Sequence, residues 1–147
     1  MKKVKLTIII ALIIICNASC CSAQNDHMHV VNMVKEFYTF YIKEAASSNS
    51  VKVTFTNLDS LESKYCTDKL INKIPDLKEQ LGGFVFIKAQ DGHLNMLNTL
   101  SIEKDSLRIT GYNVSYSYHD FYGGEKVVVM HLNVIKVNDI YKIDDLW

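Results

Sequence analysis

The last third of the chain, residues 107–147, constrains the fold most strongly, because it carries three β-rich runs separated by two turn signals. Gly123-Gly124 and Asn138-Asp139 are residue pairs that tolerate positive φ, as tight hairpin turns require. The middle run is apolar on both faces for much of its length, which is typical of a central strand. The sequence therefore predicts an antiparallel meander.

The first of these runs changes phase at Gly111. Apolar side chains alternate with polar ones at Leu107 and Ile109, and the alternation then continues one position out of step at Tyr112, Val114, Tyr116 and Tyr118. Such a slip would turn the apolar face outward unless the strand accommodates an extra residue. A β-bulge at a glycine accommodates it and bends the strand. The sequence predicts a curved sheet with a bulge at Gly111.

The start of the chain has the layout of a secretory signal peptide. Lys2, Lys3 and Lys5 form a basic region, and the apolar run of eleven residues from Leu6 to Cys16 is too short to span a bilayer comfortably. We therefore interpret residues 1–23 as a signal peptide and residues 24–147 as a single domain.

Two processing routes remain open. The tripeptide before Gln24 has the small residues that signal peptidase requires, whereas the tripeptide ending at Cys20 resembles a bacterial lipobox whose cysteine would be lipidated. Asn17 departs from the aliphatic residue that a lipobox prefers. In both cases we expect export, to the periplasm or the outer membrane of a Gram-negative bacterium.

Charge and cysteine content exclude several classes of function. Because all three lysines of the signal leave with it, residues 24–147 carry 13 basic and 16 acidic side chains. A net charge of −3 leaves no basic patch to indicate nucleic-acid binding. Cys66 is the one cysteine beyond residue 23, so it has no internal disulfide partner, and it is expected to be a buried small hydrophobe. No cofactor or metal is expected.

Helical patterns precede the sheet. An apolar, aromatic stripe over residues 27–46 predicts a helix capped by Asp26, and residues 67–81 predict a helix that kinks or restarts at Pro75. Alternation also suggests a short edge strand over 51–55 and a strand over 84–89, before a strand over 100–103. Helices followed by an antiparallel sheet indicate an α+β fold, with N-terminal helices packed on a curved sheet.

Four segments carry a family resemblance: VVNMVKEFYTFYI, LDSLESKYCTDKLINKI, FIKAQDG and VNDIYKIDDLW. Together they resemble uncharacterised bacterial envelope proteins and lipoproteins that share a domain of unknown function. That family is similar to the cystatin-like, or nuclear-transport-factor-2-like, α+β roll. The resemblance implies a long helix in the hollow of a curved sheet, and it implies no catalytic residues.

Two classes of function follow from the candidate site residues. Tyr112, Tyr116, Tyr118, Phe121 and Tyr122 concentrate aromatic rings of the kind that recognition surfaces favour. They support a non-catalytic envelope protein that binds a protein or cell-wall partner, of which an immunity or inhibitor protein is one form. The alternative is a small lyase or isomerase with a pocket between the first helix and the sheet. Its weak catalytic candidates are Asp91 and His93, with the tyrosines as oxyanion donors.

The export interpretation makes a direct prediction. Protein isolated from the bacterial envelope should begin at Gln24 or at an acylated Cys20, because signal peptidases remove the preceding residues. Intact-mass measurement distinguishes the two forms. A mass that retains Met1 would contradict the interpretation.

Overall fold

A computed structural model describes the backbone of residues 2–47, 50–119 and 123–147, and the side chains from residue 24 onward. The helices are α1 (Lys2–Ala45), α2 (Val51–Tyr65), α3 (Asp68–Ile71), α4 (Ile74–Leu81) and α5 (Met96–Thr99). The strands are β1 (Ser101–Lys104), β2 (Gly111–His119), β3 (Glu125–Val137) and β4 (Ile140–Leu146). Helices therefore precede the sheet, and the predicted α+β class is confirmed.

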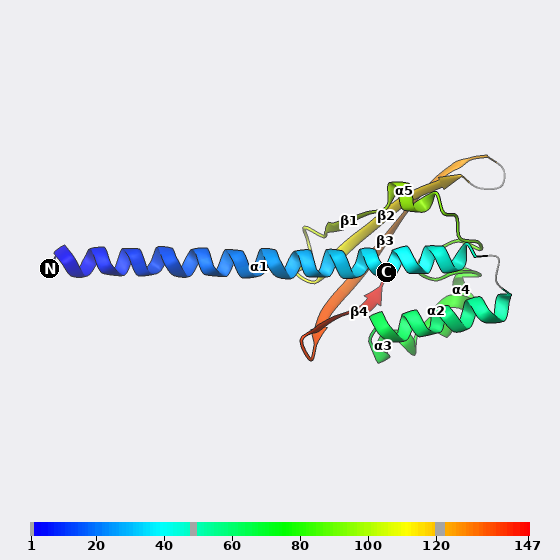
Figure 1. Cartoon of the computed structure of the whole chain (residues 1–147), viewed down its shortest axis with the longest axis horizontal. Coiled ribbons are helices and arrows are strands. Elements are labelled where there is room, and N and C mark those ends of the chain that lie inside the picture. The colour runs from blue at the N-terminus through cyan, green and yellow to red at the C-terminus, as the bar shows by residue number, and fades with distance from the viewer. Residues whose placement is uncertain (1, 48–49, 120–122) are drawn as a thin grey trace.

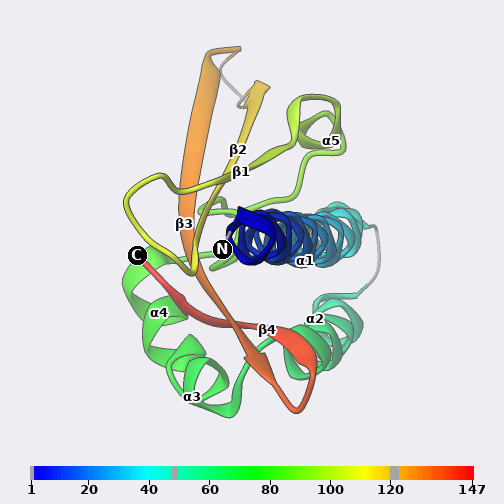
Figure 2. The ribbon, with the colours of Figure 1, turned by 90° about the vertical axis from the view of Figure 1, so that its left-hand side faces the viewer.

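The strands form one antiparallel sheet in the order β1-β2-β3-β4, which is a meander. The sheet bends around α1, while α5 lies beside β2 and α2 and α3 lie near β4 (Figures 1 and 2). Among the described residues, no helix covers the outer face of the β2–β3 hairpin (Figure 2). The sheet thus has an inner face that is packed against helices and an outer face that is open along β2 and β3.

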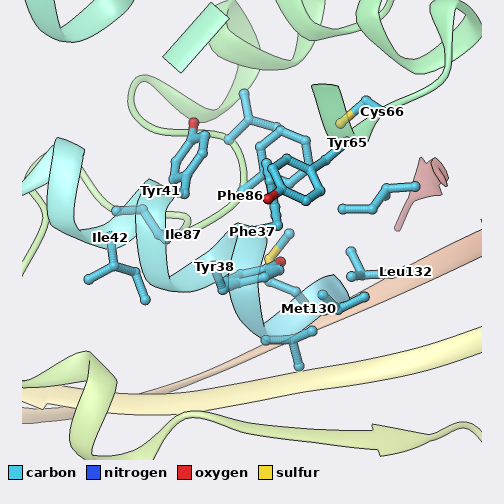
Figure 3. Close-up of a cluster of buried hydrophobic side chains, with 14 of the residues drawn as sticks. Phe37, Tyr38, Tyr41, Ile42, Tyr65, Cys66, Phe86, Ile87, Met130 and Leu132 are labelled. Atoms are coloured by element: carbon cyan, nitrogen blue, oxygen red, sulfur yellow. The ribbon is translucent and has the colours of Figure 1, made fainter. Parts of the chain in front are cut away.

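Aromatic side chains of α1 form the centre of the core (Figure 3). Phe37 is fully buried, and its ring contacts the rings of Phe86 and Tyr65 at centroid distances of 4.7 and 5.5 Å. Ring pairs at such separations contribute beyond the area that they bury. The predicted stripe of α1 is buried as expected at Val30, Val34, Phe37, Tyr38, Tyr41 and Ile42. The helix itself is longer than predicted, and Asp26 lies within it rather than at its cap.

The predicted turns lie between the expected strands. Asn138 and Asp139 both have positive φ, 48° and 64°, and they connect β3 to β4 in two residues. Gly123, with φ of 80°, precedes β3. The helix signals also hold: the Thr67 hydroxyl accepts a hydrogen bond from the Leu70 amide at 3.3 Å, and α4 restarts with Pro75 in its first turn.

The predicted bulge is at the wrong place. Gly111 begins β2, and Leu107 and Ile109 belong to an exposed loop rather than to the strand, so no phase slip occurs within β2. The irregularity lies instead between β3 and β4. Asn133 pairs with Asp145 whereas Val134 pairs with Ile143, which leaves Asp144 as the extra residue.

Two other predicted strands are wrong. Residues 51–55 begin α2, because Thr54 and Leu58 belong to a buried stripe at helical spacing, whereas the alternating apolar residues of this segment are exposed. Residues 84–89 form a turn closed by an isolated bridge between Phe84 and Ala89. This turn buries Val85, Phe86 and Ile87 in consecutive positions, which an alternating strand cannot do on one face.

The core predicts a large effect of truncating Phe37. Phe37→Ala should lower the free energy of unfolding by about 3–5 kcal/mol, as other buried aromatic truncations do. Phe40→Ala is the matched control, because Phe40 lies on the same helix and is 46% exposed. Urea denaturation measures both, and equal midpoints for the two variants would contradict the assigned helix face.

Candidate functional site

The predicted aromatic site falls largely in the core. Tyr112, Tyr116 and Tyr118 occupy alternate positions of β2 that face the helices, and all three are buried. The Tyr116 hydroxyl donates a hydrogen bond to the Ile87 carbonyl at 2.7 Å, and burial raises its pKa. The prediction that these three tyrosines form a binding surface is therefore corrected: they hold the sheet to the helical layer. Phe121 and Tyr122 lie outside the described residues, so their role stays a prediction.

The weak catalytic candidates sit at the turn beside the end of α1. The Gly92 amide donates to the Ala45 carbonyl at 3.3 Å, and a Cβ at Gly92 would lie 2.5 Å from the Ala46 nitrogen, so this close approach requires glycine. Asp91 is exposed, while the half-buried His93 ring stacks on Tyr118 with centroids 5.0 Å apart. The histidine thus has a packing role, and an acid/base role for the pair stays untested.

Core side chains occupy the space between α1 and the sheet, where the alternative function needs a pocket. Tyr38 of α1 is fully buried there and lies toward the buried Met130 of β3, whereas Tyr41 lies on the other side of the helix, next to Phe86 (Figure 3). Burial raises the pKa of Tyr38 well above its ordinary value. Core side chains thus fill the middle of the space between α1 and the sheet, whereas an open hollow lined by Asp26, Tyr112 and Tyr141 lies at its N-terminal end. The enzymatic alternative stays untested.

A polar cluster joins β4 to α3. The bulged Asp144 accepts hydrogen bonds from Lys69 at 2.6 Å and from Thr67 at 3.0 Å, and Asp145 pairs with Lys73 at 2.9 Å. Burial raises the pKa of Asp144, but the Lys69 ammonium and the hydrogen bonds outweigh it and leave the pKa below its ordinary value. Each carboxylate has a cationic partner from the α3 region, which indicates a clamp between elements rather than an acid/base dyad.

Potential metal ligands do not converge. Among the described residues, no three histidine, cysteine, aspartate or glutamate side chains lie close enough together to hold a metal ion. His27 stacks on Tyr112 with ring centroids 5.9 Å apart. Cys66 is buried, as predicted, and burial raises the pKa of its thiol, so the nucleophilic thiolate is disfavoured.

The open outer face carries a group of side chains that the sequence did not single out. Trp147 lies between two partners: its ring stacks on His131 with centroids 5.9 Å apart, and the Arg108 guanidinium lies 4.0 Å from its centroid. His131 in turn contacts the Asn113 amide oxygen at 2.7 Å. Val127 and Val129 extend this surface along β3 and are 72% and 44% exposed. We call these six residues the outer-face site: Arg108, Asn113, Val127, Val129, His131 and Trp147.

Among the described residues, no strand pairs with the edge of β3 next to this site. β4 pairs with β3 only over Leu132–Val137, and the Trp147 amide continues the ladder by donating to the His131 carbonyl at 3.1 Å. Because main-chain groups alternate along a strand, the amides and carbonyls of Val127 and Val129 point to the same edge as the His131 carbonyl. The outer-face site therefore combines a strand edge, exposed valines and an aromatic platform.

Comparison with known proteins gives one structural likeness and no family. No protein-family model matches the chain, and no curated protein matches it. A crystal structure of a protein of unknown function from Bacteroides thetaiotaomicron is similar, with a TM-score of 0.80 and 27% sequence identity. The match covers 89% of this chain and 98% of that one. The chain thus resembles an uncharacterised bacterial domain over most of its length.

Within residues 24–47, 50–119 and 123–147, no helix is both long and apolar enough to cross a membrane.

The Asp144 clamp predicts a specific pH dependence. A carboxyl whose folded pKa is lowered contributes stability above its unfolded pKa, near 3.9, and loses it as the pH falls through the folded value. Wild-type protein should therefore lose urea stability more steeply than Asp144→Asn as the pH falls below about 4. The control is Asp139→Asn, at the exposed β3–β4 turn, which should keep the wild-type slope. Parallel pH profiles for Asp144→Asn and wild type would rule out the clamp.

Proposed function

We propose that this chain is an exported, non-catalytic binding protein of the bacterial envelope, which holds a partner protein along the open edge of β3. The observation that carries the proposal is the unpaired edge at Val127 and Val129, next to the exposed platform of Trp147. An extended segment of the partner would add a strand beside β3 and continue the ladder beyond the Trp147 amide. We also propose that the fold is a cystatin-like roll, since a long helix lies along a bent antiparallel meander.

Hydrogen bonds occupy the edges of β2 and β4 at one position each, and this contrast supports a binding role for the edge of β3. On β2, the Thr99 hydroxyl caps the edge by accepting from the Ser117 amide at 2.8 Å. On β4, the Thr67 amide donates to the Ile143 carbonyl at 2.9 Å. Proteins usually cover or charge their edges because an open apolar edge invites association. A hydrogen bond thus occupies the edge of β2 at Ser117 and the edge of β4 at Ile143, whereas Val127 and Val129 are exposed at the edge of β3.

The chemistry of the edge favours a protein over a cell-wall polymer. Main-chain amides and carbonyls in strand register recognise another polypeptide backbone, and alternate side chains of that backbone would meet Val129 and Trp147. Such binding can inhibit an envelope enzyme or neutralise a toxin, because a partner segment that pairs with β3 is no longer accessible to other molecules.

A paired substitution tests this surface. Val127→Lys with Val129→Lys should abolish capture of the partner from envelope extract, because lysines on an edge strand oppose strand addition. Stability should change by less than about 0.5 kcal/mol, as for other exposed positions. Val137→Lys is the matched control, since Val137 is also exposed on β3 but pairs with Ile140 of β4.

A photo-crosslinker placed at position 129 and, separately, at position 137 provides the second measurement. The partner should be crosslinked from position 129 and not from position 137. If the lysine pair captures the same protein as the Val137→Lys control, the β3 edge is not the binding site.

A further inference from the structure

The two most exposed large hydrophobic side chains among the described residues lie on one loop. Leu107 and Ile109, in the β1–β2 connection, are 92% and 93% exposed, and Ile140, at the β3–β4 turn, is 61% exposed. The loop is fixed by its own hydrogen bonds: the Leu107 amide donates to the Asp105 carboxylate at 2.8 Å, and the Lys104 ammonium donates to the Ile109 carbonyl. These aliphatic side chains are therefore held outward by an ordered backbone.

Both loops lie at the end of the domain from which α1 extends toward the N-terminus (Figure 1). A shallow hollow at this end is lined by Asp26 of α1 together with Ile109, and a second one is lined by Asp26 together with Ile140. The apolar tips thus surround the place where residues 24–26 join the preceding segment. We call this end of the molecule the N-terminal pole.

We propose that the N-terminal pole rests on a phospholipid bilayer, with Leu107, Ile109 and Ile140 inserted among the headgroups. The tether is the same chain: on the processing route that acylates Cys20, the lipid at Cys20 occupies that bilayer. This inference rests on the proposed export of the chain and on that route. Cys20 precedes Asp26 by six residues, which is about 9 Å along a helix. The headgroup region on each side of a bilayer is of the order of 5–7 Å thick, so a tether of this length keeps the tips within reach of it.

The charges at the pole indicate that insertion is apolar rather than electrostatic. Three cations of this region are matched by three carboxylates: Lys104, Arg108 and Lys136 against Asp26, Asp105 and Asp139. Lys136 and Asp139 form an ion pair of 3.6 Å. A balanced pole gains little from anionic lipid, so contact should occur on zwitterionic vesicles and persist at high salt.

This orientation has a consequence for the outer-face site. With the pole on the membrane, the part of α1 within the domain runs away from the bilayer. The β2–β3 hairpin lies at the opposite end of the domain (Figure 1). The membrane contact therefore leaves the open part of β3 accessible from the aqueous side. The contact is a property separate from partner binding, and it can be tested without any partner.

Depth-dependent fluorescence quenching tests the proposal on protein that begins at acylated Cys20, reconstituted into phosphatidylcholine vesicles with brominated acyl chains. Trp147→Phe removes the chain's one tryptophan and serves as the background for single probes. Leu107→Trp should be quenched strongly, and equally at low and high salt. Val51→Trp is the matched control, because Val51 is exposed at the start of α2, in the opposite half of the domain, and it should not be quenched (Figure 1).

A third variant separates insertion from tethering alone. Adding Ile109→Asp to the Leu107→Trp probe should reduce its quenching about twofold or more, because a carboxylate enters the bilayer at a cost. Absence of quenching at Leu107→Trp, equal quenching at Val51→Trp, or no effect of Ile109→Asp would each overturn the proposal. The capture experiment on β3 is unaffected by any of these results.

Discussion

The aromatic stripe of α1 is the constraint on which the rest of the structure depends. Phe37 sits where three separate segments meet, in contact with Tyr65 from α2 and with Phe86 from the 84–89 turn. These rings hold α1 to α2 and to the turn, while Tyr38 lies on the side of α1 that faces the sheet (Figure 3). The β2 tyrosines complete the same cluster from the other side. The hydroxyl of Tyr116 reaches past the helix layer to the Ile87 carbonyl. The three β2 tyrosines that the sequence indicated as a recognition surface are therefore buried in the core.

Sequence patterns correctly predicted the elements that depend on residues close together in the chain. The stripe of α1, the turn at Asn138 and Asp139, and the restart at Pro75 all depend on residues near one another in the chain. The failures occurred where two local patterns compete. Val51, Val53 and Phe55 alternate like a strand, yet Thr54 begins a buried helical stripe that continues through Leu58, and the longer pattern prevails. Leu107 and Ile109 alternate too, but they have no core to face.

The candidate site was predictable only in part, because it arises from the difference in length between β3 and β4 rather than from a sequence motif. β3 has 13 residues and β4 has 7, so β4 cannot pair with all of β3. The sequence did contain this signal, since the apolar run that ends at Val137 is longer than the run after Asn138. Aromatic composition drew attention to β2 instead. Trp147 could not be placed on the outer face in advance, because its side depends on the bulge at Asp144, which shifts the register of β4.

The open edge of β3 is supported by the elements behind it. Val127 and Val129 pair with Ser117 and Ser115 of β2, and β2 is held in turn by the Thr99 hydroxyl and by the stack of Tyr118 on His93. This part of β3 is thus fixed from the side of β2, while no described residue pairs with its other edge. A partner segment that adds to such a strand must order only itself, since the receiving backbone already has the extended conformation. Preorganisation of this kind lowers the entropic cost of association.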